Sequence, residues 1–469
     1  MKTTYSTRKT ATDTASVETV NETGTHHRES IMTPVKKEAR RPQKQTKAIV
    51  AVVGLGYVGL PLAIAADAYG YDVIGFDIDP AKISKLAARD VDFLSEEESA
   101  AFDDSLLRIT ANEAVLREAD IAIICVPTPV SNDHTPDLVP LRSASVLVGR
   151  NLKKGALVVV ESTVNPGACE AVAIPVIESV SGFTAGRDFF FAHCPERINP
   201  GDGFYNVENI PRVVGGIDDE SAERAETFYR SIMSADVMRM NGIKEAEAVK
   251  MVENSFRDIN IAFVNELAMA FSKAGIDIVN VIHGAETKPF GFMPHYPGCG
   301  VGGHCIPVDP YYLITYGREN GFTHRLLMTA RNINNGMPHH TVGIAAKALR
   351  EKGKKMRGAR IALLGLAYKR DIGDMRESPA LVIRDELAAR GATVRSFDPY
   401  VPKESTVESI EDALSGADAL VIATDHSTFR GISPSLLLKH GVSVVVDGRN
   451  CLSKALFESE GIWYRGIGR

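Results

Sequence analysis

The chain has 469 residues, 44% of them hydrophobic and 24% charged, with a formal net charge of −6. This length favours two or three domains, and the balance of apolar and charged residues is typical of globular proteins. A net acidic chain gives no reason to expect nucleic-acid binding. The sequence contains no run of about 18 unbroken apolar residues, so we expect no membrane span.

The six cysteines are scattered along the chain, without the dense spacing of a secreted disulfide framework. We interpret them as mostly reduced thiols of a cytoplasmic protein. The sequence also lacks paired Cys and His residues at the spacing of a zinc finger, so we predict no metal site.

Residues 1–46 differ in composition from the rest. Through residue 47, ten Lys and Arg residues accompany five Asp and Glu residues, and the apolar residues show little periodicity. This composition predicts a disordered basic extension. A docking or targeting tail is the alternative interpretation.

Residues 47–240 are predicted to form a dinucleotide-binding domain. An apolar run at 48–53 precedes a helical stretch, and a second apolar run at 71–76 ends at Asp77. Between the first run and the helix stands Gly54-Leu55-Gly56-Tyr57-Val58-Gly59. In this context the first glycine permits a tight turn, the second lets the backbone approach a pyrophosphate, and the third allows close helix packing.

Asp77 stands where a carboxylate accepts hydrogen bonds from the ribose hydroxyls of NAD. Its charge would repel the 2′-phosphate of NADP, so the sequence favours NAD. We expect Lys82 to reach the same ribose region. The alternative is that Asp77 only caps a turn.

The remaining pattern predicts an α/β protein with two Rossmann-like, doubly wound domains bridged by a long central helix and a helical middle domain. Residues 241–356 form the helical part, with a long helix at 244–274 that we interpret as a spine and a dimer contact. Alternation restarts in residues 357–469. Predicted parallel strands lie at 121–126, 157–161, 189–192, 212–214, 360–364, 394–397, 419–423 and 442–446.

A glycine-rich loop with two thiols and a histidine occupies residues 297–310. A metal site fits it poorly, because Cys299 and Cys305 have no partner pair at suitable spacing. A structural loop with buried cysteines is a second interpretation. The third, which we favour, is a loop that presents Cys305 as a nucleophile whose pKa is lowered by nearby cations.

The segment Gly302-Gly303-His304-Cys305-Ile306-Pro307-Val308-Asp309-Pro310 resembles the catalytic loop of the UDP-glucose/GDP-mannose dehydrogenase family. The resemblance extends from Ala48 to about Gly448. Further matching motifs are 53–61, Cys125-Val126-Pro127-Thr128-Pro129, Glu161-Ser162-Thr163-Val164, Pro195-Glu196-Arg197, Lys250 with Asn254, 365–371 and Arg376-Glu377-Ser378-Pro379.

Within the family, residues 288–294 most resemble the UDP-N-acetylglucosamine 6-dehydrogenases. Cys299 stands where the family usually has proline, and His295 where it often has an aromatic residue. Both departures flank the loop expected to contact the sugar. UDP-N-acetylglucosamine is therefore the expected substrate, with UDP-N-acetylmannosamine and UDP-glucose as alternatives.

The resemblance implies oxidation of the sugar C6 alcohol to a carboxylate by two NAD in succession. The intermediates would be a thiohemiacetal and then a thioester on Cys305. The resemblance also implies a homodimer or higher oligomer whose product is used in surface polysaccharide synthesis. Lys250 would stabilise oxyanions, with Asn254 on the same helix face. Asp309 and Glu196 would handle protons and activate the water that Thr163 positions. A Glu196–Arg197 ion pair and a His304 base are weaker alternatives. Tyr57, Val58, Pro127, Thr128 and Thr163 would line the cofactor, and Arg197, Gly302, Gly303, Lys369, Arg376 and Arg449 the substrate.

Two other functions fit parts of the sequence. A two-electron alcohol or hydroxyacid dehydrogenase could use the same scaffold, but it needs no thioester and hence no Cys305. A catalytically silent nucleotide-binding regulator would show degraded catalytic positions, whereas Cys305, Lys250, Asn254 and Asp309 all match.

Overall fold

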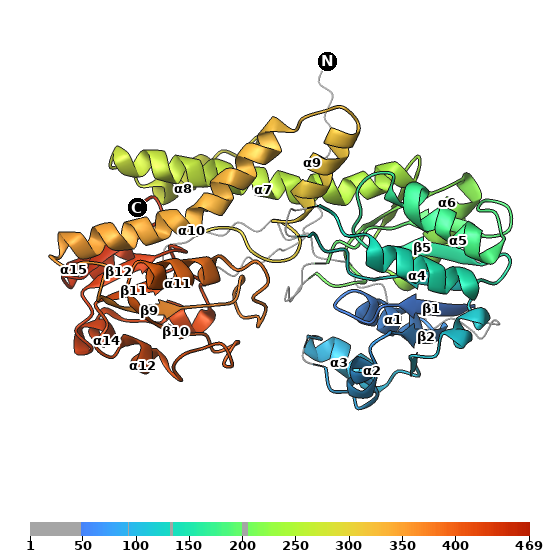
Figure 1. Ribbon diagram of the computed structural model, residues 1–469, viewed down its shortest axis with the longest axis horizontal. Helices are drawn as coiled ribbons and strands as arrows, with labels where there is room; N and C mark the ends of the chain where they lie inside the picture. The colour runs from blue at the N-terminus through green and yellow to red at the C-terminus, as the bar shows by residue number, and fades with distance from the viewer. Residues whose placement is uncertain (1–47, 92, 132–134, 199–204) are drawn as a thin grey trace, which may run out of the picture. The chain divides into compact units, whose positions relative to one another are not determined.

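The computed structural model describes residues 48–91, 93–131, 135–198 and 205–469. The prediction for the basic extension lies outside these residues. The described chain contains two sheets that are joined in sequence by helices, among them α7 (Ile243–Lys273) and α10 (Arg325–Glu351) (Figure 1). The predicted fold class, two Rossmann-like domains with a helical middle, is confirmed.

The first sheet has eight strands in the order β3-β2-β1-β4-β5-β6-β7-β8. Its first six strands follow the order 3-2-1-4-5-6 of dinucleotide-binding folds, which leaves a crevice at the carboxyl ends of β1 and β4. The strands are β1 Ile49–Val53, β2 Asp72–Phe76, β3 Arg108–Thr110, β4 Ile121–Ile124, β5 Leu157–Val160, β6 Phe190–His193, β7 Arg212–Gly216 and β8 Val237–Arg239. The accompanying helices are α1 Gly59–Ala68, α2 Pro80–Ala87, α3 Glu96–Asp103, η1 Glu113–Glu118, α4 Val139–Arg150, η2 Cys169–Ala173, α5 Ile174–Ser181 and α6 Asp219–Ile232.

One pair of strands departs from the parallel arrangement that we predicted. β6 and β7 run antiparallel, with Ala192 opposite Gly216. No helix lies among the described residues between these two strands, and β7 pairs with β6, the strand that precedes it in the chain. Antiparallel neighbours need no crossover connection, whereas parallel neighbours do.

The second sheet has five parallel strands in the order β10-β9-β11-β12-β13. Renumbered within this lobe the order is 2-1-3-4-5, another doubly wound arrangement, and its strand order reverses between β9 and β11. The strands are β9 Arg360–Leu364, β10 Thr393–Phe397, β11 Ala419–Ile422, β12 Val444–Asp447 and β13 Trp463–Gly466. The helices are α11 Pro379–Ala389, α12 Ile410–Leu414, α13 Ser427–Arg430, α14 Pro434–Lys439 and α15 Lys454–Ser459.

The two lobes share a turn but use it differently. In the first lobe, the backbone N–H of Leu55 donates to Asp77 at the end of β2 (3.0 Å). In the second, the N–H of Leu366 donates in the same way to Asp398 (2.7 Å). The Asp398 oxygen also lies 2.9 Å from Nε2 of the buried His426. The carboxylate of the second lobe is therefore enclosed by its own lobe.

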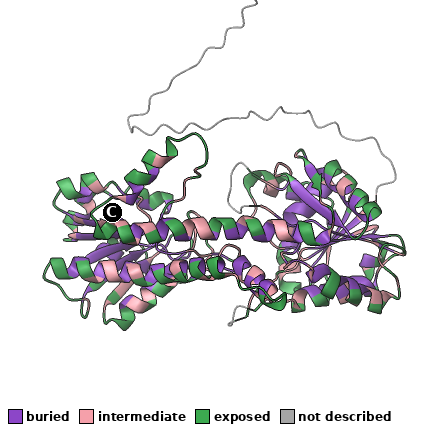
Figure 2. Ribbon diagram, turned by 90° about the horizontal axis from the view of Figure 1, so that it is seen from above, coloured by how far each residue is buried: buried purple, intermediate pink, exposed green. Residues whose placement is uncertain are grey.

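The middle of the chain is helical, as predicted. The long helix expected at 244–274 is α7, which packs against α10 through a buried ion pair between Asp258 and Arg331 (2.6 Å). The shorter helices are α8 Ile278–Glu286 and α9 Asp309–Glu319. Figure 2 shows burial concentrated on the strands, while the helices expose one face.

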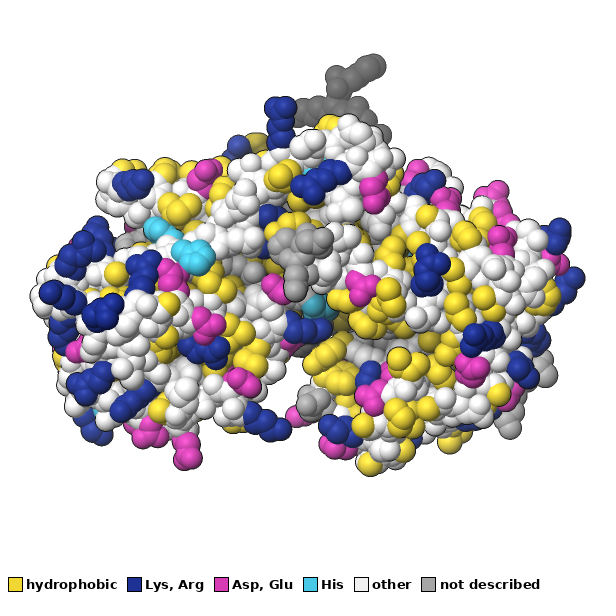
Figure 3. Space-filling model, viewed as in Figure 1, with side chains coloured by type: hydrophobic (Ala, Val, Ile, Leu, Met, Phe, Trp, Pro, Cys, Tyr) yellow, Lys and Arg dark blue, Asp and Glu magenta, His cyan; other side chains and the backbone are white. Residues whose placement is uncertain are grey.

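The surface carries charges of both signs. On the face seen in Figure 3, Lys and Arg side chains are interspersed with Asp and Glu side chains. In the part of the chain that the structure describes, no helix combines the length and the apolar character needed to cross a membrane.

Candidate active site

The glycine turn after β1 combines two tightly packed positions with an open one. Gly54 has a φ of +98°, and a Cβ on it would lie 2.6 Å from the carbonyl oxygen of Cys125. A Cβ on Gly59 would lie 1.9 Å from the carbonyl oxygen of Gly54, so α1 packs directly on the turn. A Cβ on Gly56 would meet no atom within 4 Å, which leaves open space beside the backbone. Gly54 and Gly59 thus have the turn and packing roles expected from the sequence, while the approach of a pyrophosphate to Gly56 stays a prediction.

Asp77 and Lys82 come together at the end of β2. The Asp77 carboxylate accepts hydrogen bonds from the N–H groups of Leu55 and Asp79 (3.0 and 3.1 Å) and from Lys82 Nζ (2.8 Å). Burial raises the pKa of Asp77, but these donors outweigh it and hold the pKa below its ordinary value. Asp77 is therefore an anion that shapes the turn, and its contact with the ribose of NAD stays a prediction.

A short hydrogen-bonded chain links the cofactor lobe to the helix that follows the cysteine loop. Thr128 Oγ1 donates to the carbonyl oxygen of Thr163 (2.6 Å). The hydroxyl of Tyr312, on α9, donates to the carbonyl oxygen of Thr128 (2.7 Å). Sequence reasoning missed Tyr312, since nothing in its spacing marks it as a partner of Thr128.

Other predicted cofactor residues border this region. Val58 immediately precedes α1, and Pro127 is exposed after β4. Tyr57 is 44% exposed, and the guanidinium carbon of Arg376 lies 5.8 Å from the centre of its ring. Tyr57 and Arg376, predicted for different ligands, thus lie beside each other.

Lys250 and Asn254 lie one turn apart on α7, and both are buried. Lys250 Nζ donates to the backbone carbonyl of Glu196 (2.5 Å) and lies 3.5 Å from Glu196 Oε2. Asn254 Nδ2 donates to Asp309 Oδ2 (2.5 Å). The spacing of four residues places both side chains on one helix face, as predicted.

Cys305 lies in the turn that leads into α9. Its carbonyl oxygen accepts hydrogen bonds from the N–H groups of Val308 (3.0 Å) and Asp309 (2.8 Å). Asp309 is the first residue of α9 and is buried. The hydrogen bonds of this turn therefore hold Cys305, the candidate nucleophile, close to Asp309, the candidate carboxylate.

The resting charge state of Cys305 differs from our expectation. Burial raises the pKa of its thiol to about 12. The charges of Asp309 and Glu196 contribute to this rise, against the opposing charges of Lys250 and Arg376. The expectation that nearby cations lower this pKa is wrong, because burial and two carboxylates outweigh the cations. Cys305 is a protonated thiol until its proton is removed.

The two carboxylates beside Cys305 hold protons more tightly than usual. Burial raises the pKa of Asp309 to about 7, against the Lys250 charge and the Asn254 hydrogen bond. Burial also raises the pKa of Glu196, against the charges of Lys250 and Arg212. Asp309, whose pKa lies near neutral pH, is therefore suited to acid–base work.

Glu196 pairs with Lys250 rather than with its neighbour. Arg197 donates instead to Glu253 of α7 (Nε to Oε2, 3.2 Å) and to the carbonyl oxygen of Pro211 (2.7 Å). Glu196 Oε1 is buried and has no hydrogen-bond partner among the described residues. That oxygen is available to a ligand or a water.

A buried charge cluster behind Glu196 was not predicted. Arg212, at the start of β7, donates to Glu161 (3.0 Å), which also accepts from the hydroxyl of Tyr229 (2.5 Å). All three side chains are buried. The sequence signal was a charged residue at the start of an apolar strand, which we interpreted only as a strand boundary.

The glycines of the cysteine loop provide close contact with the second lobe. A Cβ on Gly302 would lie 2.6 Å from Tyr368 Cβ and 2.8 Å from the carbonyl oxygen of Glu377. Gly303 has a φ of +93°, and its N–H donates to the carbonyl oxygen of Arg376 (2.9 Å). The loop is therefore fixed against residues that follow β9.

The predicted cations of the second lobe lie after its strands. Lys369 follows β9 and is partly buried, and Arg449 follows β12. Arg449 donates to the carbonyl oxygens of Ala423 (2.8 Å) and Tyr368 (3.2 Å). Arg376 forms an ion pair with Asp374 (2.5 Å). Lys369 and Arg449 thus lie at the edge of the sheet where doubly wound folds bind ligands.

The two departures from the family pattern lie in different surroundings. Cys299 is fully buried in the core of the second lobe, and its thiol donates to the carbonyl oxygen of Ala423 (3.2 Å). His295 is half-buried, and its ring lies 6.1 Å from that of Phe256 on α7. His304 is exposed.

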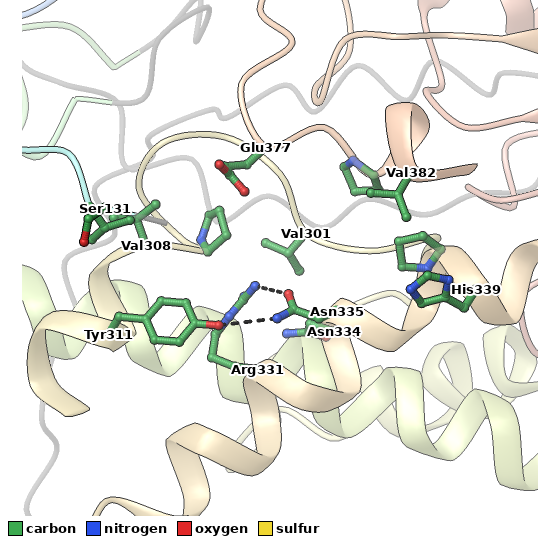
Figure 4. Close-up of a pocket in the computed structure, with 14 residues that line it drawn as sticks. Ser131, Val301, Val308, Tyr311, Arg331, Asn334, Asn335, His339, Glu377 and Val382 are labelled. Carbon is green, nitrogen blue, oxygen red and sulfur yellow. Dashed lines mark hydrogen bonds between the residues drawn. The ribbon is translucent and has the colours of Figure 1, made fainter. Parts of the chain in front are cut away.

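A pocket of about 350 Å³ lies against the cysteine loop but does not contain the catalytic candidates. Figure 4 shows Val301 and Val308 of the loop above Tyr311, Arg331 and Asn335. Asn335 accepts from Arg331 (2.5 Å) and donates to Tyr311 (3.4 Å). Because Cys305 and Lys250 are not among its lining residues, we do not assign the chemistry to this pocket.

Three domain models of one family match the chain in order. The NAD binding domain of the UDP-glucose/GDP-mannose dehydrogenase family matches residues 48–233, the central domain matches 244–336, and the UDP binding domain matches 362–454.

Individual relatives match along most of their length. A UDP-N-acetyl-D-mannosamine dehydrogenase of Pyrococcus horikoshii is 39% identical over 427 residues, 90% of this chain and 99% of that protein. A UDP-N-acetyl-D-glucosamine 6-dehydrogenase of Pseudomonas aeruginosa is 40% identical over 401 residues, 84% of this chain and 94% of that protein. The solved structure of the UDP-D-ManNAc dehydrogenase from Pyrococcus horikoshii superposes with a TM-score of 0.85 at 38% identity, covering 90% of this chain and 99% of that one.

Proposed function

Because the chain belongs to the UDP-glucose/GDP-mannose dehydrogenase family, we propose that it oxidises the C6 alcohol of a UDP-sugar to a carboxylate through a covalent bond to Cys305. One observation carries the proposal: Lys250 contacts Glu196, Asn254 donates to Asp309, and the Asp309 N–H donates to the carbonyl oxygen of Cys305, so a buried ammonium and two buried carboxylates gather at the cysteine turn. A two-electron dehydrogenase needs no such thiol, and a silent binding protein needs no such cluster.

NAD is the cofactor of this family's first domain, and the turn after β1 fits it. The open space beside Gly56 admits a pyrophosphate, and Asp77 presents a carboxylate to the ribose. When bound, NAD supplies the hydride acceptor for each oxidation.

Lys250 is proposed to stabilise negative charge on the substrate oxygen. An ammonium has three N–H donors, and one of them is used by the carbonyl oxygen of Glu196. Loss of a hydride from C6, with loss of the hydroxyl proton, gives an aldehyde. Lys250 can donate to the substrate oxygen before and after the hydride is lost. Asn254, one turn away on α7, holds the carboxylate of Asp309.

The second oxidation starts from a sulfur–carbon bond. The Cys305 thiol gives its proton to Asp309, and the sulfur adds to the aldehyde carbon while the carbonyl oxygen takes the electron pair and a proton. Loss of a second hydride from that carbon and of the hydroxyl proton leaves a thioester. An acceptor with a pKa of about 7 suits a thiol that is protonated at rest.

Hydrolysis completes the proposed reaction. Water adds to the thioester carbon, the carbon–sulfur bond breaks, and the sulfur regains a proton as the carboxylate leaves. Glu196 is the proposed base for this water, since its Oε1 has no partner among the described residues. Thr163, which Thr128 contacts, is proposed to position the water.

The substrate is proposed to be UDP-N-acetylglucosamine, on the resemblance of residues 288–294. UDP-N-acetylmannosamine and UDP-glucose are the alternatives. The two relatives of about 40% identity are named for UDP-N-acetylmannosamine and for UDP-N-acetylglucosamine. Lys369 and Arg449 are proposed to contact the UDP portion, at the edge of the second sheet. Arg197, Arg376, Gly302 and Gly303 are proposed to border the sugar.

We also propose a cytoplasmic homodimer that supplies sugar acids for surface polysaccharide synthesis. All six cysteines are free thiols, which suits a reducing compartment. On α7, Val252, Phe256 and Phe263 expose 59%, 46% and 54% of their surface, as expected for an apolar helix face that a second copy covers.

The decisive test is the ratio of NADH formed to sugar consumed, measured with a panel of the three UDP-sugars. The proposal predicts a ratio of two and a sugar acid as product. A ratio of one, with an aldehyde as product, would exclude the thioester route and leave a two-electron dehydrogenase. The sugar with the highest kcat/KM identifies the substrate.

A further inference from the structure

We propose that Cys169, His193 and Glu247 form a buried site for one divalent metal ion of the zinc class. This site lies outside the residues assigned to catalysis, and it goes beyond the proposed function. Sequence analysis did not predict this site, because the three residues are far apart in the chain and belong to η2, β6 and α7.

The three side chains converge on one point. One donor atom from each lies within 4.8 Å of the other two. Cys169 Sγ lies 3.8 Å from His193 Nδ1. Zinc–sulfur and zinc–nitrogen bonds of about 2.3 and 2.1 Å at a tetrahedral angle separate the two donors by about 3.6 Å. The observed separation therefore requires little movement to admit an ion.

The protein itself leaves these groups incompletely bonded. The Glu247 oxygens accept from the N–H groups of Gly167 and Cys169 (2.5 and 2.9 Å), and the Glu247 carboxylate is also hydrogen-bonded to the Cys169 side chain. His193 is fully buried, and its Nε2 has no partner among the described residues. A cation bound between the three side chains would compensate the buried Glu247 carboxylate.

The donor set selects the kind of ion. A thiolate with an imidazole and one carboxylate suits zinc or a similar borderline-soft ion, whereas magnesium and calcium prefer all-oxygen sites. Burial lowers the pKa of His193 to about 3, so its imidazole is already neutral and able to bind. Binding releases the Cys169 proton to solvent, together with the Glu247 proton when that carboxyl is protonated.

The position of the site indicates a structural role. Glu247 lies one turn before Lys250 on α7, and His193 lies three residues before Glu196. Cys169 begins η2, on the segment that follows Thr163. An ion held by all three would fix the elements that carry these proposed catalytic residues relative to one another.

The test begins with the full chain expressed in zinc-supplemented medium and purified without chelator. Metal analysis should find about one zinc per chain, and removing it with a strong chelator should lower Tm by several degrees, reversibly on zinc addition. Cobalt in place of zinc should give a sulfur-to-cobalt charge-transfer band. Fewer than about 0.1 ions per chain, with no change of Tm on zinc addition, would overturn the proposal.

Variants distinguish this site from adventitious binding. Cys169→Ser and His193→Gln should each lose the ion and the cobalt band. Cys194→Ser, which removes the buried thiol next in sequence to His193, is the matched control and should keep both. Retention of the ion by Cys169→Ser and His193→Gln would place the metal elsewhere. Should either variant fail to fold, the other and the wild-type measurements decide. None of these results depends on the reaction, so they stand apart from a failure of the proposed function.

Discussion

Asn254 Nδ2 donates a hydrogen bond of 2.5 Å to Asp309 Oδ2, joining α7 to the first residue of α9. The amide holds the carboxylate in one orientation beside Cys305, and burial raises the pKa of that carboxylate to about 7. The charge state of Asp309 therefore changes within the pH range in which enzymes are assayed.

The rate of acid formation should increase as the pH rises through about 7. Asp309 must be ionised to accept the Cys305 proton, and a raised pKa keeps it protonated below that pH. The pH dependence of kcat/KM measures this. Asp309→Asn should lower kcat and remove the ascending limb. An unchanged limb in that variant would assign it to another group.

Asp309 should also make stability depend on pH. Its folded-state pKa is raised above the unfolded value, so the contribution of its protonated form is complete below pH 4 and is lost as pH rises through about 7. The wild-type protein should therefore lose more stability between pH 5 and 8 than Asp309→Asn does. Urea unfolding at several pH values tests this, and equal losses would contradict it.

Cys305→Ser should abolish steady turnover, by about 1000-fold or more, because a serine hydroxyl cannot replace the sulfur in the thioester. NAD binding, measured by calorimetry, should remain nearly unchanged. Cys299→Ser is a matched control on the same loop, since serine can keep the hydrogen bond to Ala423. Acid production at the wild-type rate by Cys305→Ser would remove this residue from the mechanism.

Lys250→Met should lower kcat about 100- to 1000-fold, since it removes the donor proposed for the substrate oxygen. Methionine has a similar length, so the packing of α7 should change little. Separate measurement of kcat and KM tests the role. A large rise in KM with kcat unchanged would show that Lys250 contributes only to binding.

Gly302→Ala should destabilise the protein by about 1–3 kcal/mol and lower kcat. Its new methyl group would meet Tyr368 and the carbonyl oxygen of Glu377 at under 3 Å, and the loop bearing Cys305 would have to shift. Gly336→Ala is the control, because a Cβ there meets nothing within 4 Å in α10. Urea unfolding and kcat, measured for both variants, test this contrast. Equal stability of the two would contradict it.

Asp77→Asn should raise the KM for NAD about tenfold, equivalent to about 1.4 kcal/mol, and improve the relative use of NADP. It removes the charge but keeps an acceptor for the N–H of Leu55. Asp79→Asn, at the exposed start of α2, should leave both values unchanged. If Asp77→Asn left the ratio of the KM values for NAD and NADP unchanged, Asp77 would have no role in selecting NAD over NADP.

Much of the fold could be predicted, because buried parallel strands such as β1 are continuous apolar runs. Strand β3 has only three residues, none of them buried, and gives no such signal. The direction of β7 was also missed, since an apolar run does not encode whether it runs parallel to its neighbour.

The candidate site was predictable where its residues are close in sequence. Lys250 and Asn254 share a helix face by spacing alone. The partners of Arg212 were not predictable, because Glu161 and Tyr229 come from other elements. The pKa of Cys305 depends on burial and on the summed charges of distant residues, which the loop sequence does not contain.

Under the proposed function, the enclosure of Asp398 leaves only the first lobe to hold an electron acceptor. The Asp398 carboxylate is bonded to Leu366, Ala367 and His426, so the second lobe has no counterpart of the carboxylate that Asp77 is proposed to offer to NAD. Under the proposed function, the dinucleotide must then depart and be replaced midway through each catalytic cycle. The lifetime of the sugar–sulfur adduct sets how long that exchange can take without releasing a reactive aldehyde into the cell.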